Sequence, residues 1–329
     1  MRILVPTVAL ALLGLAFGVG AVDRPPRERP TPELTPPDVH RTTPPARRPT
    51  RPPQFIVVSF DGAGGARLWG YWRRIAREAH AHFTFFLSGV YLVDWAHHDL
   101  YDPPEHARGE SAIGFAPDEG WIRAMLHQID RGYREGHEIG THYNGHFCGP
   151  EGVGTWTVAD WTRELDQFDE LMRRVRLPFG TGAIAGGRTP CLEGDLDVLY
   201  PVLARRGFRY DASRTALIGT WPTRHDGIWS IPLLELPYPG HSYRVVSMDY
   251  NFFANGASEA GMYEALWNAF EQAYRGNRAP LSLGNHFETW KAWAYDHALT
   301  RFLLRACRLP EVRCASFVEL VDWLDRNRR

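Results

Sequence analysis

The chain has 329 residues, a formal net charge of −1 and an apolar content of 44%. This composition supplies enough apolar surface for a folded core and excludes global disorder. The near-neutral charge argues against nucleic acid as a partner, because nucleic-acid binding needs a basic surface.

Residues 1–21 have the pattern of an export signal. One basic residue, Arg2, precedes an apolar run from 3 to 19, and small residues follow up to Ala21. The pattern predicts a signal peptide and a secreted or cell-envelope location. The run is short for a membrane span and Asp23 follows at once, but an uncleaved anchor stays open as an alternative.

Residues 22–53 contain eleven prolines and seven arginines and almost nothing that could be buried. Such a segment is expected to be extended and semi-rigid, without packed structure. We interpret it as a solvated spacer whose arginines could also contact an anionic cell wall. Residues 54–329 then remain as one folded domain.

Strands and helices alternate along this domain. Residues 55–62 form a near-continuous apolar run that ends at a polar residue before glycines, which is typical of a buried parallel strand. Ser316 is expected to cap a last helix, with Glu319 three residues later. Repeated alternation predicts a parallel sheet or an α/β barrel. Further strands are predicted at 82–89 and 136–142. Helices are predicted at 68–79, 121–133, 158–175 and 259–274. The same alternation continues through the segments 184–189, 198–207, 243–250 and 279–287.

Polar side chains end several of these predicted strands. Asp61 comes first, followed by His142 and His146, then Arg188, and finally His286. The Asn-Gly pair between the two histidines favours a turn over a helix, and a turn can still bring both imidazoles to one ion. Together these residue types suit metal-assisted hydrolysis, in which an ion polarises water, a carboxylate takes the proton and a histidine protonates the leaving group.

The predicted export decides how the four cysteines are interpreted. An even number in an oxidising compartment favours disulfides, and four cysteines allow three connectivities. Cys307 and Cys314 are close in sequence and are paired, which leaves Cys148 with Cys191. A cysteine zinc site is not favoured, because the chain has no C-x-x-C pair.

The order of the motifs SFDG, HYNGH, RTP and LGNH resembles the polysaccharide deacetylases of carbohydrate esterase family four, also called the nodulation-type deacetylase domain. The segments GHEIGTH, RRGFRYDAS and NRAPLSLGNH are similar to the chitin deacetylase-like branch of that family. The resemblance covers residues 54–329. It implies a distorted (β/α) barrel in a single domain and a divalent metal, with zinc as the expected ion.

The resemblance also implies roles for individual residues. Asp61 corresponds to the catalytic base and Arg188 to the residue that orients it. His142 and His146 correspond to the metal ligands. His286 corresponds to the general acid.

Three further residues complete the implied site. The backbone N–H of Cys191 corresponds to a donor of the oxyanion hole, and Asp249 is a looser match for the acid that orients the final histidine. Trp290 follows that histidine closely, and we expect it to contact the sugar, with core packing as the alternative.

The sequence departs from the family pattern at several positions. Gly62 replaces the second aspartate of the first motif, which is a metal ligand in the family. Tyr143 stands where serine or threonine supports the metal loop, and Cys191 stands where an aromatic residue is common. The loss of a carboxylate ligand predicts weaker metal binding.

The resulting hypothesis is an exported, monomeric deacetylase. It would remove N- or O-acetyl groups from a polysaccharide, either chitin-like or peptidoglycan. One alternative is a non-catalytic glycan-binding relative with an incomplete metal site. A second is an amidase that acts on other non-peptide C–N bonds.

Overall fold

The computed structural model describes residues 51–177 and 179–328. The predicted signal peptide and nearly all of the predicted linker lie outside these residues. Among the helices of the described part, none is long and apolar enough to cross a lipid bilayer.

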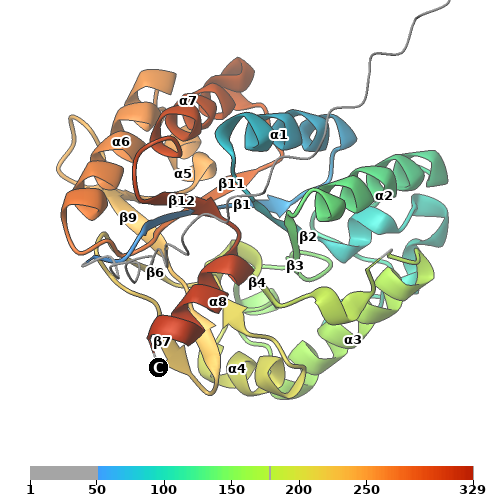
Figure 1. Cartoon of the computed structure of the whole chain (residues 1–329). Helices are drawn as coiled ribbons and strands as arrows, with labels where there is room; N and C mark the ends of the chain where they lie inside the picture. Colours follow the sequence, from blue (N-terminus) through green and yellow to red (C-terminus); the bar gives the residue numbers. More distant parts are fainter. Residues whose placement is uncertain (1–50, 178, 329) are drawn as a thin grey trace, which may run out of the picture. The chain divides into compact units, whose positions relative to one another are not determined.

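A curled sheet of nine strands forms the centre of this part (Figure 1). Its order is β11-β1-β2-β3-β4-β5-β8-β7, and β12 adds to β1. Its pairings are parallel, apart from the antiparallel hairpin of β7 and β8. The predicted distorted α/β barrel is confirmed. The strands are β1 (Gln54–Gly62), β2 (Thr84–Leu87), β3 (Glu138–Thr141), β4 (Gly186–Gly187), β5 (Tyr210–Asp211), β7 (Thr223–His225), β8 (Ile228–Ser230), β11 (Leu281–His286) and β12 (Val312–Ala315).

A second sheet of three short strands was predicted only in part, since one of its strands lies within the expected element over 243–250. Strand β9 (Leu233–Pro237) pairs in parallel with β6 (Thr215–Leu217) and antiparallel with β10 (Arg244–Val246). Strands of three residues carry too little periodicity to be recognised in a sequence. Beyond β10 the chain turns into a helix at Asp249, so the expected element over 243–250 is part strand and part helix start.

Helices surround the main sheet in Figure 1. The predicted helices at 68–79, 121–133, 158–175 and 259–274 are confirmed within a few residues. The last helix begins with a reciprocal capping box between Ser316 and Glu319, as predicted. The helices are α1 (Ala66–Ala79), α2 (Glu119–Arg134), α3 (Val158–Arg174), α4 (Leu196–Arg205), α5 (Asp249–Ala254), α6 (Glu259–Arg275), α7 (Trp290–Ala306) and α8 (Phe317–Asn327).

Strand β1 separates two cores. Its side chains alternate, so that Phe55 and Val57 pack with residues of α8, whereas Ile56 and Val58 belong to the core beneath the outer helices. Helix α8 contacts the beginnings of the strands, since the backbone N–H of Phe317 donates to Thr84 at the start of β2. The opposite ends of the strands are left for the site.

Candidate active site

The carboxyl ends of neighbouring strands bring the predicted residues together. In the parallel register of β1 and β11, Asp61 lies opposite His286. On the other side of β1, Leu87 of β2 pairs with Thr141 of β3, and Thr141 pairs with Gly187 of β4. His142 and Arg188 directly follow these last two residues, so strand pairing places the four motifs at one edge of the sheet, as the sequence predicted.

Arg188 and Asp61 form a buried ion pair beneath this edge. Arg188 is 0% exposed and Asp61 is 4% exposed. Arg188 Nη1 donates to Asp61 Oδ1 at 2.7 Å and to Ser59 Oγ at 2.7 Å, and its Nε donates to the carbonyl oxygen of Ala212 at 2.9 Å. Burial opposes ionisation of the carboxyl, but the charge and hydrogen bond of Arg188 act together with the neighbouring histidines and lower the pKa of Asp61. Asp61 is therefore a carboxylate in a fixed orientation.

The two histidines lie on a turn, as the Asn-Gly pair predicted. Tyr143 and His146 adopt left-handed backbone angles, with φ of 60° and 59°. The ring centroids of His142 and His146 are 4.9 Å apart. His142 Nδ1 lies 2.8 Å from the carbonyl oxygen of Arg188, which can only accept, so this nitrogen carries the proton and Nε2 keeps its lone pair.

Both imidazoles are neutral near pH 7. Burial lowers the pKa of His142 to about 3 and also lowers the pKa of His146. The neutral ring is the form that binds a divalent metal. Two neutral imidazoles suit zinc, but the ligand atoms of Asp61, His142 and His146 do not all lie within 4.8 Å of one another, so among the described residues the histidine pair is the part of the site that fits an ion.

A disulfide joins the two loops that follow β3 and β4. Cys148 and Cys191 are bonded, with 6.0 Å between their Cα atoms, and Cys307 is bonded to Cys314. Both predicted pairings are confirmed. The two sulfurs of the first bond lie close enough to His146 to share an ion with it. Disulfide sulfur lacks the thiolate charge that a metal ligand needs, so this bond ties the loops together and supplies no ligand.

His286 is paired with Asp249 at the start of α5. His286 Nδ1 lies 2.7 Å from Asp249 Oδ1, and the backbone N–H of His286 donates to Oδ2 at 2.8 Å. Burial alone would lower the pKa of His286, but the charge and hydrogen bond of Asp249 raise it to about 9. His286 is therefore an imidazolium at neutral pH. Behind this pair, burial followed by the charge of Asp249 raises the pKa of Asp296 to about 7.

Two cavities of about 250 and 460 Å³ open at this edge, and both are lined by Asp61, the histidine pair and His286. Cys191 lines the larger cavity and Trp290 the smaller one. Arg188 and Asp249 lie behind the lining residues they contact. All the predicted site residues are thus brought together around one cleft.

Sequence reasoning missed several residues of the cleft. Tyr250 lines both cavities, and Ser88 and Tyr91 line the smaller one. Within the described part of the chain, the buried Ser88 hydroxyl has no hydrogen-bond partner. Only Tyr250 had a signal in the sequence, since it directly follows Asp249.

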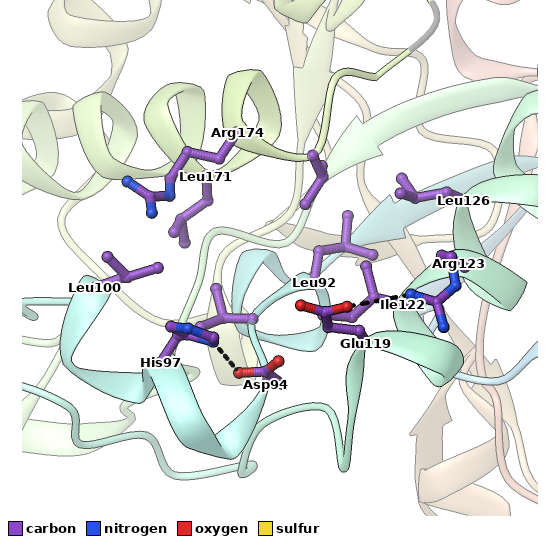
Figure 2. Close-up of a pocket in the computed structure, with 12 residues that line it drawn as sticks. Leu92, Asp94, His97, Leu100, Glu119, Ile122, Arg123, Leu126, Leu171 and Arg174 are labelled. Carbon is purple, nitrogen blue, oxygen red and sulfur yellow. Dashed lines mark hydrogen bonds and ion pairs between the residues drawn. The ribbon is translucent and has the colours of Figure 1, made fainter.

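Another cavity, of about 320 Å³, lies between α2 and α3 (Figure 2). Leucines line it, and Asp94 Oδ1 lies 2.6 Å from His97 Nδ1 at its rim. None of the sequence-predicted site residues is among the described residues that line it.

No protein-family model matches the chain. In sequence it is similar to chitin deacetylase 8 of Bombyx mori, with 23% identity over 301 residues that cover 83% of this chain and 70% of the relative. In structure it is similar to a Mycobacterium smegmatis protein provisionally named a polysaccharide deacetylase, with a TM-score of 0.56, 16% identity, and coverage of 84% of this chain and 92% of that one. The chain therefore has the fold of the polysaccharide deacetylases and is similar in sequence to one of them. A carbohydrate esterase family 4 pseudoenzyme from Bacillus anthracis aligns with a TM-score of 0.46, at 11% identity over 83% of this chain and 66% of its own.

Within this polysaccharide deacetylase fold, Gly62 has a strongly constrained position. Its φ is +75°, and a Cβ atom built on it would lie 3.3 Å from Tyr91 Cε2. Non-glycine residues adopt this left-handed region at a cost, with aspartate and asparagine among the better tolerated. An aspartate at position 62 would therefore strain the backbone and displace the tyrosine ring.

Proposed function

We propose that this protein is an exported, metal-dependent hydrolase that removes acetyl groups from a chitin-like or peptidoglycan polysaccharide. The observation that carries the proposal is the convergence of an anionic carboxylate, two neutral imidazoles and a histidine–aspartate pair on one cleft. Each group has the protonation state that its role requires at neutral pH.

Asp61 is the proposed base. Its carboxylate faces the cleft and its orientation is fixed by the hydrogen bond from Arg188. It would take a proton from the water that attacks the acetyl carbonyl carbon. Arg188 holds the carboxylate in place, so its role is positioning.

His142 and His146 are the proposed metal ligands, with Asp61 beside them. A bound divalent ion, of which zinc is the best match to imidazole, would polarise the water and the carbonyl group. The hydrogen bond from His142 Nδ1 to the carbonyl oxygen of Arg188 keeps Nε2 available and fixes the ring orientation.

His286 is the proposed general acid. As an imidazolium held by Asp249, it would donate its Nε2 proton to the leaving nitrogen or oxygen when the bond to the acetyl carbon breaks. The backbone N–H of Cys191, on the loop tied by the disulfide, is the proposed hydrogen-bond donor to the developing oxyanion. Trp290 is the proposed contact to the sugar.

Two disulfides within the described residues support an oxidising, extracytoplasmic location. The proposal includes a signal peptide over 1–21, a spacer over 22–53 that could contact the cell wall, a catalytic domain over 54–329 and a monomeric protein. The second candidate is a protein that binds glycans without catalysis. Gly62 favours this candidate, because glycine stands where the resemblance implies a carboxylate metal ligand.

The test is acetate release by zinc-loaded protein from N-acetylglucosamine oligomers and from peptidoglycan. The proposal expects acetate from at least one glycan, and expects its loss when the ion is removed by a chelator and its return on re-addition. Glycan binding without acetate release would establish the non-catalytic candidate instead. Cleavage of a simple amide with no acetate from any glycan would establish the amidase alternative.

A further inference from the structure

Three aromatic rings lie together at the mouth of the cleft. Tyr250 is 52% exposed and Phe253 is 39% exposed, which is unusual for large apolar side chains, and Trp290 is partly exposed. Phe253 and Trp290 stack at 5.0 Å between centroids with an interplanar angle of 13°, and Tyr250 lies 5.9 Å from Trp290. We call these three residues the aromatic platform.

The aromatic platform is continuous with the proposed catalytic centre. The Trp290 ring lies 5.5 Å from the His286 ring, and Tyr250 lies 6.4 Å from it. Tyr250 lines both cavities that contain His286. Phe253 is one helical turn beyond Tyr250 on α5 and does not line either cavity, so the platform leads outward from the cleft.

Lys291, the only lysine in the chain, ties the two halves of the platform together. Its Nζ donates to the carbonyl oxygens of Gly256 at 2.8 Å and Ala257 at 2.9 Å, just beyond the end of α5. Tyr295 donates to the same carbonyl oxygen of Ala257 at 2.9 Å. These bonds join the start of α7, which carries Trp290, to the segment that follows Phe253.

The backbone beside Trp290 is held in a conformation that needs such support. Lys291, Ala292 and Trp293 have φ of 49°, 53° and 72°, which is a run of non-glycine residues in the left-handed region. Strained backbone of this kind persists only where surrounding contacts fix it, and it is concentrated at functional sites. The two bonds from the lysine ammonium are contacts of that kind.

We propose that the aromatic platform is a subsite that stacks the sugar rings of a β-linked hexopyranose chain beyond the residue being deacetylated, and that Lys291 is the positioning residue that holds it. The inference rests on the proposed function. A β-linked pyranose presents C–H groups on a flat face, which matches a flat, exposed, uncharged aromatic surface. The occupant is therefore the polysaccharide itself, and longer oligomers should bind more tightly than the monosaccharide.

The first experiment measures binding, so that it is independent of catalysis. Titration calorimetry with N-acetylglucosamine and its hexamer would compare the Asp61→Asn protein with the same protein carrying Phe253→Ala. The hexamer affinity should fall about three- to tenfold, the usual range for one aromatic contact, and the ratio of hexamer to monomer affinity should fall with it. Tyr133→Ala is the matched control, because Tyr133 is 42% exposed and stacks on Phe179 away from the cleft, and it should change nothing.

The second experiment tests Lys291. Lys291→Met should weaken hexamer binding at least as much as Phe253→Ala, and Lys291→Arg should restore it, because arginine can still donate to both carbonyl oxygens. Acetylation of the amines of the wild-type chain should have the effect of Lys291→Met. The same treatment of the Lys291→Arg protein, in which only the terminal amine remains, should have none.

The outcomes separate the platform from the catalytic proposal. Equal hexamer and monomer affinities in the parent protein, or an unchanged hexamer affinity after Phe253→Ala, would overturn the platform. Loss of binding in both Lys291 variants would show that Lys291 supports the fold without positioning the rings. Tight, platform-dependent hexamer binding by a wild-type protein that releases no acetate would support the platform and refute the catalytic function.

Discussion

The Asp249–His286 pair should set the alkaline limit of activity, and Asp249→Asn tests this. The substitution keeps the size of the side chain and removes the charge that lies 2.7 Å from His286 Nδ1. The pKa of His286 is about 9 in the folded protein, against an ordinary value of 6.5. The difference corresponds to about 3.4 kcal/mol, at about 1.36 kcal/mol per pKa unit.

The rate effect follows from the protonated fraction of the general acid. At pH 8, a histidine with a pKa of about 9 is about 90% protonated, and one with a pKa of about 6.5 is about 3% protonated. Because burial lowers the pKa of His286 once the charge of Asp249 is gone, Asp249→Asn should lower kcat at least about 30-fold at pH 8 and by a smaller factor at pH 6, with the alkaline limb displaced by at least about 2.5 pH units.

The same pair has a defined effect on stability. Because the pKa of His286 is raised on folding, its stabilisation is complete below about pH 6.5 and is lost as the pH rises through about 9. Asp249→Asn should lower the free energy of unfolding at pH 6 by up to about 3 kcal/mol and have much less effect at pH 10.

The assay is acetate release from N-acetylglucosamine oligomers between pH 5 and 10, with denaturant unfolding at both extremes. Asp94→Asn is a matched control, because Asp94 pairs with His97 at 2.6 Å outside the cleft (Figure 2), and it should leave the profile unchanged. An alkaline limb that stays in place after Asp249→Asn would refute the assignment of His286 as an acid held by Asp249.

Further predictions concern the loops and the metal. The Cys148–Cys191 bond spans 43 residues, and replacing both of its cysteines should lower the free energy of unfolding by about 4 kcal/mol and also lower kcat. The Cys307–Cys314 bond spans 7 residues, and replacing its cysteines should lower the free energy of unfolding by about 2.4 kcal/mol and leave kcat unchanged. Equal effects of the two pairs on kcat would show that the first bond does not hold the site. Gly62→Asp should tighten zinc binding in calorimetry while lowering stability by about 1 kcal/mol, and Gly62→Ala should lower stability by a similar amount without tightening binding. Tight zinc binding by the wild type that is unchanged by Gly62→Asp would reveal a ligand not identified here.

The parts of the fold that follow local rules were predictable. The apolar run of β1 ends at Asp61, and the predicted strand before His286 ends at that histidine. Because the carboxyl ends of parallel strands meet at the same edge of a sheet, the two residues were expected to lie close together, and they are opposite each other in the register of β1 and β11. The Asn-Gly pair after His142 predicted a turn, and the spacing of Ser316 and Glu319 predicted a capping box. In each case the signal lies within a few residues of the feature it determines.

Features that depend on distant contacts were not predictable. The helix that begins at Asp249 was not predicted, because the apolar residues before it suggested a continuing strand. The contact of its carboxylate with His286 was expected only from the family resemblance, and no local pattern of residues indicates it. Lys291 and the two residues after it have no intrinsic preference for left-handed angles. Their conformation is supported by the carbonyl groups of Gly256 and Ala257, which lie just beyond the end of α5 and more than thirty residues earlier in the chain.

The most direct test of the account is acetate release from the N-acetylglucosamine hexamer by zinc-loaded wild-type protein and by Asp61→Asn, measured side by side. The account predicts measurable turnover by the wild type and a loss on the order of 10²–10⁴-fold in the variant, with hexamer binding retained. Turnover by Asp61→Asn within a few-fold of the wild type, or no turnover by a wild-type protein that binds both zinc and hexamer, would contradict it.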